Sequence, residues 1–240
     1  MRAQRRPQAQ PVRRLSDSAQ RRGARGTPPK PDLTFERQAG GIVAGIDEAG
    51  RGPLAGPVVA AAVILSQGAV PADLDDSKCL SAAQREDIFV SLLATADIGV
   101  GAASVAEIDR INVLAATMLA MQRATASLVR RLGHPPDLAL IDGNRAPDLM
   151  CATRTIVDGD ALCASIAAAS VIAKVTRDRA MTALAAVHSG YGWDHNFGYA
   201  TAEHRLALTI LGPSPHHRRS FSPLRSGETS GASQQLSLTC

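Results

Sequence analysis

Residues 42–58 read Ile-Val-Ala-Gly-Ile-Asp-Glu-Ala-Gly-Arg-Gly-Pro-Leu-Ala-Gly-Pro-Val, and most of what the sequence predicts follows from this stretch. Its apolar start, residues 42–46, predicts a buried strand, and Asp47 and Glu48 follow at the end of that strand. Carboxylates are the ligands that a hard cation such as Mg²⁺ prefers. The Gly50-Arg51-Gly52 step that comes next suits close approach to a phosphate backbone. We therefore expect metal-assisted chemistry on a nucleic acid rather than a surface turn with solvated charges.

On both sides of this stretch, strands and helices alternate, which predicts an α/β fold. Apolar runs rich in β-branched residues predict strands at residues 58–65, 98–105, 138–141 and 153–157. Ser81 and Gln84 have the spacing of a capping box and predict a helix to about residue 95. Helical periodicity predicts further helices over residues 105–132, 162–188 and 201–211. Small residues at positions 165–170 predict that another element or a substrate approaches the third of these four helices closely.

Acidic residues follow three of the predicted strands: Asp47 and Glu48, then Asp142, then Asp158 and Asp160. Ligands of open α/β sheets usually lie at strand ends, so we expect these acids to converge. Their mutual repulsion must be relieved by protons or by cations, and two divalent ions about 3.5–4 Å apart would suit attack of water on a phosphodiester. Spacing alone does not choose between Asp158 and Asp160. Because neighbouring strand residues face opposite ways, Asp47 and Glu48 can share a site only if the strand ends or bends there.

From about residue 41 to about residue 224 the chain resembles the ribonuclease HII family, which cleaves RNA embedded in or hybridised to DNA. The resemblance implies a ribonuclease H-like mixed central sheet flanked by helices, with a helical C-terminal portion. It implies hydrolysis of the phosphodiester 5′ to a ribonucleotide, leaving 3′-hydroxyl and 5′-phosphate ends, with Mg²⁺ or Mn²⁺. The family's Gly-Asp step matches Gly159-Asp160. The implied catalytic and metal-binding residues are therefore Asp47, Glu48, Asp142 and Asp160.

The resemblance also implies contacts to the substrate. Gly50, Arg51 and Gly52 match the element that contacts the ribonucleotide, and Tyr199 matches a tyrosine that stacks on the next deoxyribose. Phe197 stands where a lysine is common, which puts one phosphate contact in question. The remaining implied contacts are Lys78, Ser165, Ser170 and Lys174.

Three neighbouring features are less specific. Arg177 is expected on the nucleic-acid side of the long helix or on a solvated face, and Asp178 is expected to pair with Arg177 or Arg179. Residues 216–221 are expected to form a basic patch or to dock through Phe221, because no acid or cysteine spacing supports a metal site there.

Length and composition predict one catalytic domain, residues 38–224, between two tails. The 240 residues carry a net charge of +4. Residues 1–37 contain ten Lys/Arg and three Asp/Glu, so this segment is strongly basic. We expect this basic extension to be disordered and either to attract phosphate or to have no role; a targeting peptide is a further alternative. The four cysteines lack paired metal spacing, which predicts reduced thiols in a cytoplasmic monomer. No apolar stretch is long enough for a membrane span.

The predicted flexible C-terminal tail, residues 225–240, contains Gln234-Gln235-Leu236-Ser237-Leu238. This string resembles the short peptide by which bacterial replication and repair enzymes bind the sliding clamp, with Gln235, Leu236 and Leu238 as the contacts. Leucines in an extended segment can fill apolar pockets on a partner. Thr239 stands where a terminal aromatic residue is usual.

Three functions remain open at this stage. The first is an endoribonuclease of the resembled family, acting in ribonucleotide removal and in DNA replication and repair. The second is another metal-dependent nuclease of related fold, such as a junction resolvase. The third is a catalytically silent module that binds hybrids. The Gly50-Arg51-Gly52 step and Tyr199 favour the first, because a resolvase has no need to sense a 2′-hydroxyl group.

Overall fold

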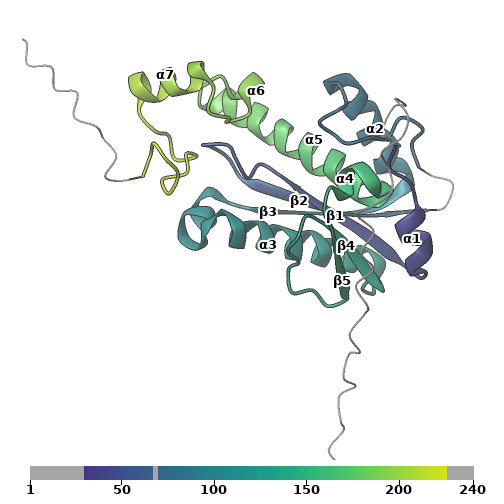
Figure 1. The fold of residues 1–240 in the computed structure, drawn as a ribbon. Helices are drawn as coiled ribbons and strands as arrows, with labels where there is room; N and C mark the ends of the chain where they lie inside the picture. Colours follow the sequence, from purple (N-terminus) through teal and green to yellow (C-terminus); the bar gives the residue numbers. More distant parts are fainter. Residues whose placement is uncertain (1–29, 67–69, 226–240) are drawn as a thin grey trace, which may run out of the picture.

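A computed structural model of the chain describes residues 30–66 and 70–225. Its centre is a five-stranded mixed sheet with the order β3-β2-β1-β4-β5 (Figure 1). The strands are β1 (Val43–Ala49), β2 (Val58–Leu65), β3 (Ala96–Ala103), β4 (Leu138–Asp142) and β5 (Ala152–Ile156). β1, β2 and β3 pair antiparallel, whereas β4 lies parallel to both β1 and β5. The predicted α/β class and mixed sheet are confirmed.

Helices cover both faces of this sheet. In Figure 1, α3 (Val105–Leu132) lies across one face and α5 (Ala164–Val187) across the other, with α2 (Ala82–Thr95) beside α5. Short helices α1 (Thr34–Ala39) and α4 (Gly159–Leu162) lie near the start of α5. α6 (Trp193–Asn196) and α7 (Ala202–Leu211) form the expected helical C-terminal portion. Within the described residues, no helix combines the length and apolar character needed to cross a membrane.

Glycine lets the sheet and α5 approach closely. A Cβ atom on Gly45 of β1 would lie 2.1 Å from the backbone carbonyl carbon of Ser165. The facing part of α5 consists of small buried residues, and Ala167, Ala168 and Ala169 are all inaccessible to solvent. The prediction that the small residues permit close approach is confirmed, and the approaching element is β1.

Two predicted helices are interrupted. The helix expected over residues 162–188 is divided at Cys163, whose φ of −119° and ψ of 121° are extended values, into α4 and α5. α3 contains a kink at Asn112, whose φ of 67° is left-handed. The Asn112 side chain caps the second part of α3, because its Oδ1 accepts hydrogen bonds from the amides of Leu114 (3.0 Å) and Ala115 (3.1 Å).

The folded part of the chain begins before residue 38. Helix α1 lies within the stretch that was expected to be disordered, and Phe35 packs against the cluster that includes Val43 and Leu140. Oε1 of Glu36 accepts hydrogen bonds from the amide of Ser165 (2.8 Å) and the thiol of Cys163 (3.1 Å), so α1 caps α5. The expected boundary at residue 37 is therefore too late. Residues 1–29 and the Gln234–Leu238 string lie outside the described residues.

Candidate active site

A pocket of about 250 Å³ lies where β1 and β4 end, beneath the loop at residues 75–80 and beside α5. It collects acidic, basic and hydroxyl side chains that are far apart in sequence. The lining residues are Asp47, Glu48, Ala49, Gly50, Ser77, Lys78, Arg85, Asp142, Ser170, Lys174 and Tyr199. Three of the four acids expected to converge therefore border one cavity.

The strand carrying Asp47 and Glu48 does not end before them. β1 stays paired with β2 through Ala49, but its pairing with β4 stops at Ile46. Both acids therefore lie beyond the last residue that β4 covers, and both reach the same pocket. The sequence requires the strand to end or bend at these two acids. The pairing with β4 does end before them, whereas the pairing with β2 continues.

Asp47 is held in place while its charge is disfavoured. Its Oδ1 accepts a hydrogen bond from the amide of Glu48 (2.7 Å), and the nearby hydroxyl of Ser170 favours its charged form. Only 6% of the residue is exposed. Burial, followed by the nearby charges of Glu48 and Asp142, raises the pKa of Asp47 well above its usual range.

Glu48 accepts a hydrogen bond from Nη1 of Arg51 at 3.0 Å. Burial raises the pKa of Glu48, although Arg51 opposes the shift and Asp142 adds to it. The arginine of the Gly50-Arg51-Gly52 step thus lies against the acid cluster in this structure.

Asp142 joins β4 to the start of α4, because its Oδ1 accepts a hydrogen bond from the amide of Gly159 (2.8 Å). Burial and then the charge of Asp160 raise the pKa of Asp142, against the amide bond from Gly159. Asp160 is buried, with 5% of the residue exposed, whereas Asp158 is exposed and has a left-handed backbone. The two acids that spacing left equivalent thus differ clearly in position.

Lys78 lies against Asp160, with its Nζ 2.7 Å from Oδ2, and 3.7 Å from Oδ1 of Asp76. Partial burial would lower the pKa of Lys78, but the bond to Asp160 and the surrounding acids outweigh burial and raise it. Its expected role was to contact phosphate; in this structure its partner is a carboxylate.

Hard carboxylate oxygens are the donor set that fits a divalent cation such as Mg²⁺. Burial and, after it, repulsion from neighbouring acids raise the pKa of Asp47 and Asp142, and a bound cation relieves that repulsion. Within the described residues, no three acidic, histidine or cysteine side chains are already arranged around one ion position. Instead, Arg51 forms an ion pair with Glu48, and Lys78 forms one with Asp160. The cluster thus already attracts positive charge, and its carboxylate oxygens are suitable ligands for a divalent cation.

Two buried arginines hold the Gly50–Pro57 loop. Arg218 donates hydrogen bonds to the carbonyl oxygens of Gly50 (2.6 Å), Arg51 (2.9 Å), Gly56 (2.8 Å from Nη2) and Pro57 (3.2 Å). Arg177 donates to the carbonyls of Pro57 (3.0 Å), Ala55 (3.1 Å) and Phe197 (3.1 Å). Burial and then Arg177 lower the pKa of Arg218 to about 9. Sequence reasoning missed Arg218 and assigned Arg177 to a surface; both are buried loop supports.

Tyr199 lies at the mouth of the pocket and is 45% exposed. A Cβ atom on Gly52 would meet its ring at 4.0 Å, so the tyrosine and the glycine–arginine step are neighbours. Nζ of Lys174 lies 4.9 Å from the centre of the Phe197 ring and 2.8 Å from Oδ1 of Asp178. The ammonium group of Lys174 thus lies beside Phe197, the residue that stands where a lysine is common in the family. Asp178 pairs with Lys174 and not, as expected, with Arg177 or Arg179.

The two serines of α5 have different surroundings. The hydroxyl of Ser170 lies in the pocket, 2.8 Å from that of Ser77. Ser165 is inaccessible to solvent, and its hydroxyl lies 3.4 Å from the sulfur of Cys163. The expectation that Ser165 lines the substrate surface is therefore wrong in this structure, because its position beside Gly45 is covered by the sheet.

His217 and His204 belong to the core, whereas His216 is half-buried. Nε2 of buried His217 lies 3.0 Å from Nε2 of His204, which also accepts a hydrogen bond from the indole of Trp193 (3.1 Å). Nδ1 of His204 contacts the carbonyl of Tyr199 at 2.9 Å. Burial and then His204 lower the pKa of His217 to about 4. Phe221 packs against the α3 side of the sheet, so the docking alternative is confirmed for this segment.

Comparison with known proteins gives consistent matches. A family model described as Ribonuclease HII matches residues 44–223. Ribonuclease HII of Granulibacter bethesdensis is 59% identical over 207 residues, covering 84% of this chain and 93% of the relative. In the PCNA:RNase HII complex from Archaeoglobus fulgidus, a chain 27% identical has a TM-score of 0.59, with 74% of this chain and 93% of that chain covered. Ribonuclease H2 from Pyrococcus horikoshii is 26% identical with a TM-score of 0.61, covering 78% and 97%. The family match includes all four acids of the candidate site.

Proposed function

Because the chain belongs to the ribonuclease HII family and is an endoribonuclease, we propose that it cuts the phosphodiester on the 5′ side of ribonucleotides, in RNA–DNA hybrids or embedded in duplex DNA. The products are 3′-hydroxyl and 5′-phosphate ends. The observed sheet is the expected ribonuclease H-like fold, shared with the Pyrococcus horikoshii ribonuclease H2. The observation that supports the assignment of the reaction to this pocket is the meeting of Asp47, Glu48 and Asp142 around it.

In this proposal Asp47, Glu48, Asp142 and Asp160 hold Mg²⁺ or Mn²⁺. A divalent cation bound there supplies an activated water and stabilises the leaving oxygen. The protein's own part is positioning: the amide of Glu48 and the hydroxyl of Ser170 orient Asp47, and the amide of Gly159 orients Asp142.

The substrate contacts follow from the same geometry. In the structure, Arg51 and Lys78 form ion pairs with carboxylates of the cluster. When bound metal neutralises those carboxylates, the two side chains become available to bind phosphate. Backbone groups of Gly50 and Gly52 face the 2′-hydroxyl in this proposal, and Tyr199 supports the following deoxyribose. Lys174, beside Phe197, supplies the phosphate contact for which the family commonly uses lysine.

The decisive assay uses a DNA duplex with one embedded ribonucleotide, beside an all-DNA four-way junction, each with Mg²⁺ or Mn²⁺. We expect a single cut on the 5′ side of the ribonucleotide and none in the junction. Asp47→Asn and Asp160→Asn should lower the cutting rate by about 100-fold or more, because each removes a charged ligand, while binding persists. Asp158→Asn is the matched control, since Asp158 is exposed. Junction cutting would favour the resolvase alternative, and binding without cutting by the wild type would favour a silent module.

We further propose that the tail binds a sliding clamp through Gln235, Leu236 and Leu238. The support is the sequence string together with the PCNA complex formed by the Archaeoglobus fulgidus relative. Removal of residues 234–240 should abolish co-elution with the clamp and leave hydrolysis of a short duplex unchanged. Co-elution that survives this removal would end the proposal.

A further inference from the structure

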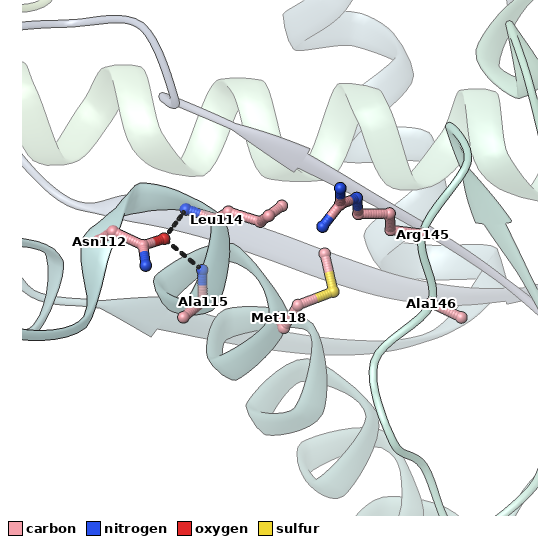
Figure 2. Close-up of a pocket in the computed structure, with 6 residues that line it drawn as sticks. All are labelled: Asn112, Leu114, Ala115, Met118, Arg145 and Ala146. Atoms are coloured by element: carbon pink, nitrogen blue, oxygen red, sulfur yellow. Dashed lines mark hydrogen bonds between the residues drawn. The ribbon is translucent and has the colours of Figure 1, made fainter.

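An open groove of about 530 Å³ lies between the kink of α3 and the loop that follows β4. Its lining residues are Asn112, Leu114, Ala115, Met118, Arg145 and Ala146. Figure 2 shows the Arg145 guanidinium directed toward Leu114, with Met118 below it. The groove therefore combines an apolar floor with one cationic group at its edge.

The charge of Arg145 has no partner within the part of the chain that the structure describes. No hydrogen bond or ion pair connects its guanidinium to another described side chain or carbonyl, and the residue is exposed. Some surface arginines are paired, and Arg123 contacts both carboxylate oxygens of Glu107 at 2.9 and 2.7 Å, whereas exposed Arg130 resembles Arg145 in having no side-chain partner among the described residues. The Oδ1 atom of Asn112 is already used to cap α3, so Arg145 is the charged group that the groove offers.

The groove is connected to the acid cluster by a short piece of chain. Arg145 follows Asp142 by three residues in the same loop, so their Cα atoms are at most about 11 Å apart. This separation is comparable to the width of the major groove of duplex DNA, about 12 Å. A duplex bound at Asp142 is therefore wide enough to reach the groove.

We propose that this groove holds one phosphate and the adjoining deoxyribose of the duplex that is cut at the acid cluster. Arg145 binds the phosphate through its forked donors, and Leu114, Ala115 and Met118 contact the apolar face of the sugar. The inference rests on the proposed function, because it extends the substrate surface of the same site. It adds a contact on the α3 side of the sheet to those on α5 and the Gly50–Pro57 loop.

The test compares Arg145→Gln with Arg130→Gln. Arg130 is a matched control: it is exposed, basic and on α3, but close to the opposite end of that helix from the groove. Both substitutions are made in the Asp47→Asn background, and binding to a duplex with one ribonucleotide is followed by fluorescence anisotropy between low and moderate salt. For Arg145→Gln we expect a Kd raised about 5- to 10-fold at low salt. The slope of log K against log[salt] should become shallower by about 0.9, which corresponds to one lost phosphate contact.

Duplexes with one methylphosphonate at a time then locate the contact. At one position, removal of the phosphate charge should weaken binding by the protein that retains Arg145, but should not weaken binding by the Arg145→Gln variant any further. Equal Kd and equal slope for the two substitutions, with the unmodified enzyme still cutting at the ribonucleotide, would overturn the groove proposal and leave the proposed function intact. An unmodified enzyme that fails to cut such duplexes would refute the proposed function itself.

Discussion

Replacement of Arg218 by methionine tests whether buried guanidinium groups hold the Gly50–Pro57 loop. The substitution keeps an unbranched side chain, shorter than arginine by the end of the guanidinium, and removes every donor. The carbonyls of Gly50, Arg51 and Gly56 would lose the hydrogen bonds that Arg218 gives them, whereas the carbonyl of Pro57 keeps its bond from Arg177. Two buried acceptors, on Gly50 and Gly56, and a partly buried one on Arg51 are therefore left without that donor.

Each unsatisfied buried carbonyl costs about 1–3 kcal/mol, which gives roughly 2–6 kcal/mol for the two buried carbonyls and a smaller addition for that of Arg51. Removal of a desolvated charge close to Arg177 offsets several kcal/mol of this cost. We expect a net loss of about 3 kcal/mol in the free energy of unfolding. Arg218→Lys should lose at least as much, because an ammonium keeps the buried charge but cannot serve the same acceptors in fork geometry.

Urea denaturation of both variants, with kcat and KM on a duplex containing one ribonucleotide, checks this expectation. kcat should fall with stability, because the loop carries the glycine–arginine step of the proposed site. Arg219→Met is the control, since the neighbouring side chain is exposed. An Arg218→Lys protein within about 0.5 kcal/mol of the wild type would refute the reasoning.

The packing supports three further predictions. The pKa of His217 is about 4 in the folded protein against 6.5 for a free histidine, so between pH 4 and pH 6.5 the unfolded chain binds more protons than the folded one. The free energy of unfolding should therefore fall by up to about 3 kcal/mol as the pH drops from 6.5 to 4. In urea titrations, His217→Asn should make this dependence on pH weaker. Asn112→Ala should cost about 2 kcal/mol and Asn112→Gly clearly less by the same measurement, because glycine loses the cap but tolerates a φ of 67°; equal losses would contradict this. Gly45→Ala should cost about 3 kcal/mol or more in thermal and urea unfolding, because its Cβ meets the α5 backbone, whereas Gly52→Ala should change stability little.

Local signals predicted much of the fold. The strands follow from β-branched runs, and the capping box at Ser81 is present with both of its hydrogen bonds. Asn112 carried a readable signal as well, because asparagine is a strong N-cap, but continuous helical periodicity on both sides of it concealed the kink. The break at Cys163 has no comparable signal, since neither glycine nor proline stands there.

What the sequence could not predict depends on distant partners. The acceptors of Arg218 lie about 160 positions earlier in the chain, so its burial is invisible in the run His216-His217-Arg218-Arg219. Helix α1 has six residues, too few to be stable alone, and its order comes from packing of Phe35 and from the bonds of Glu36. Asp160 is distinguished from Asp158 by burial, which depends on how α4 meets β4.

The contact of Glu36 with the start of α5 has a practical consequence for anyone shortening this chain. The family match begins at residue 44, which invites truncation just before it. Such a trimmed protein would retain all four acids yet lack the carboxylate that caps the helix bearing Ser170 and Lys174. A loss of activity after trimming would then report a frayed helix rather than a missing ligand, so any minimal version of the enzyme should begin no later than residue 30.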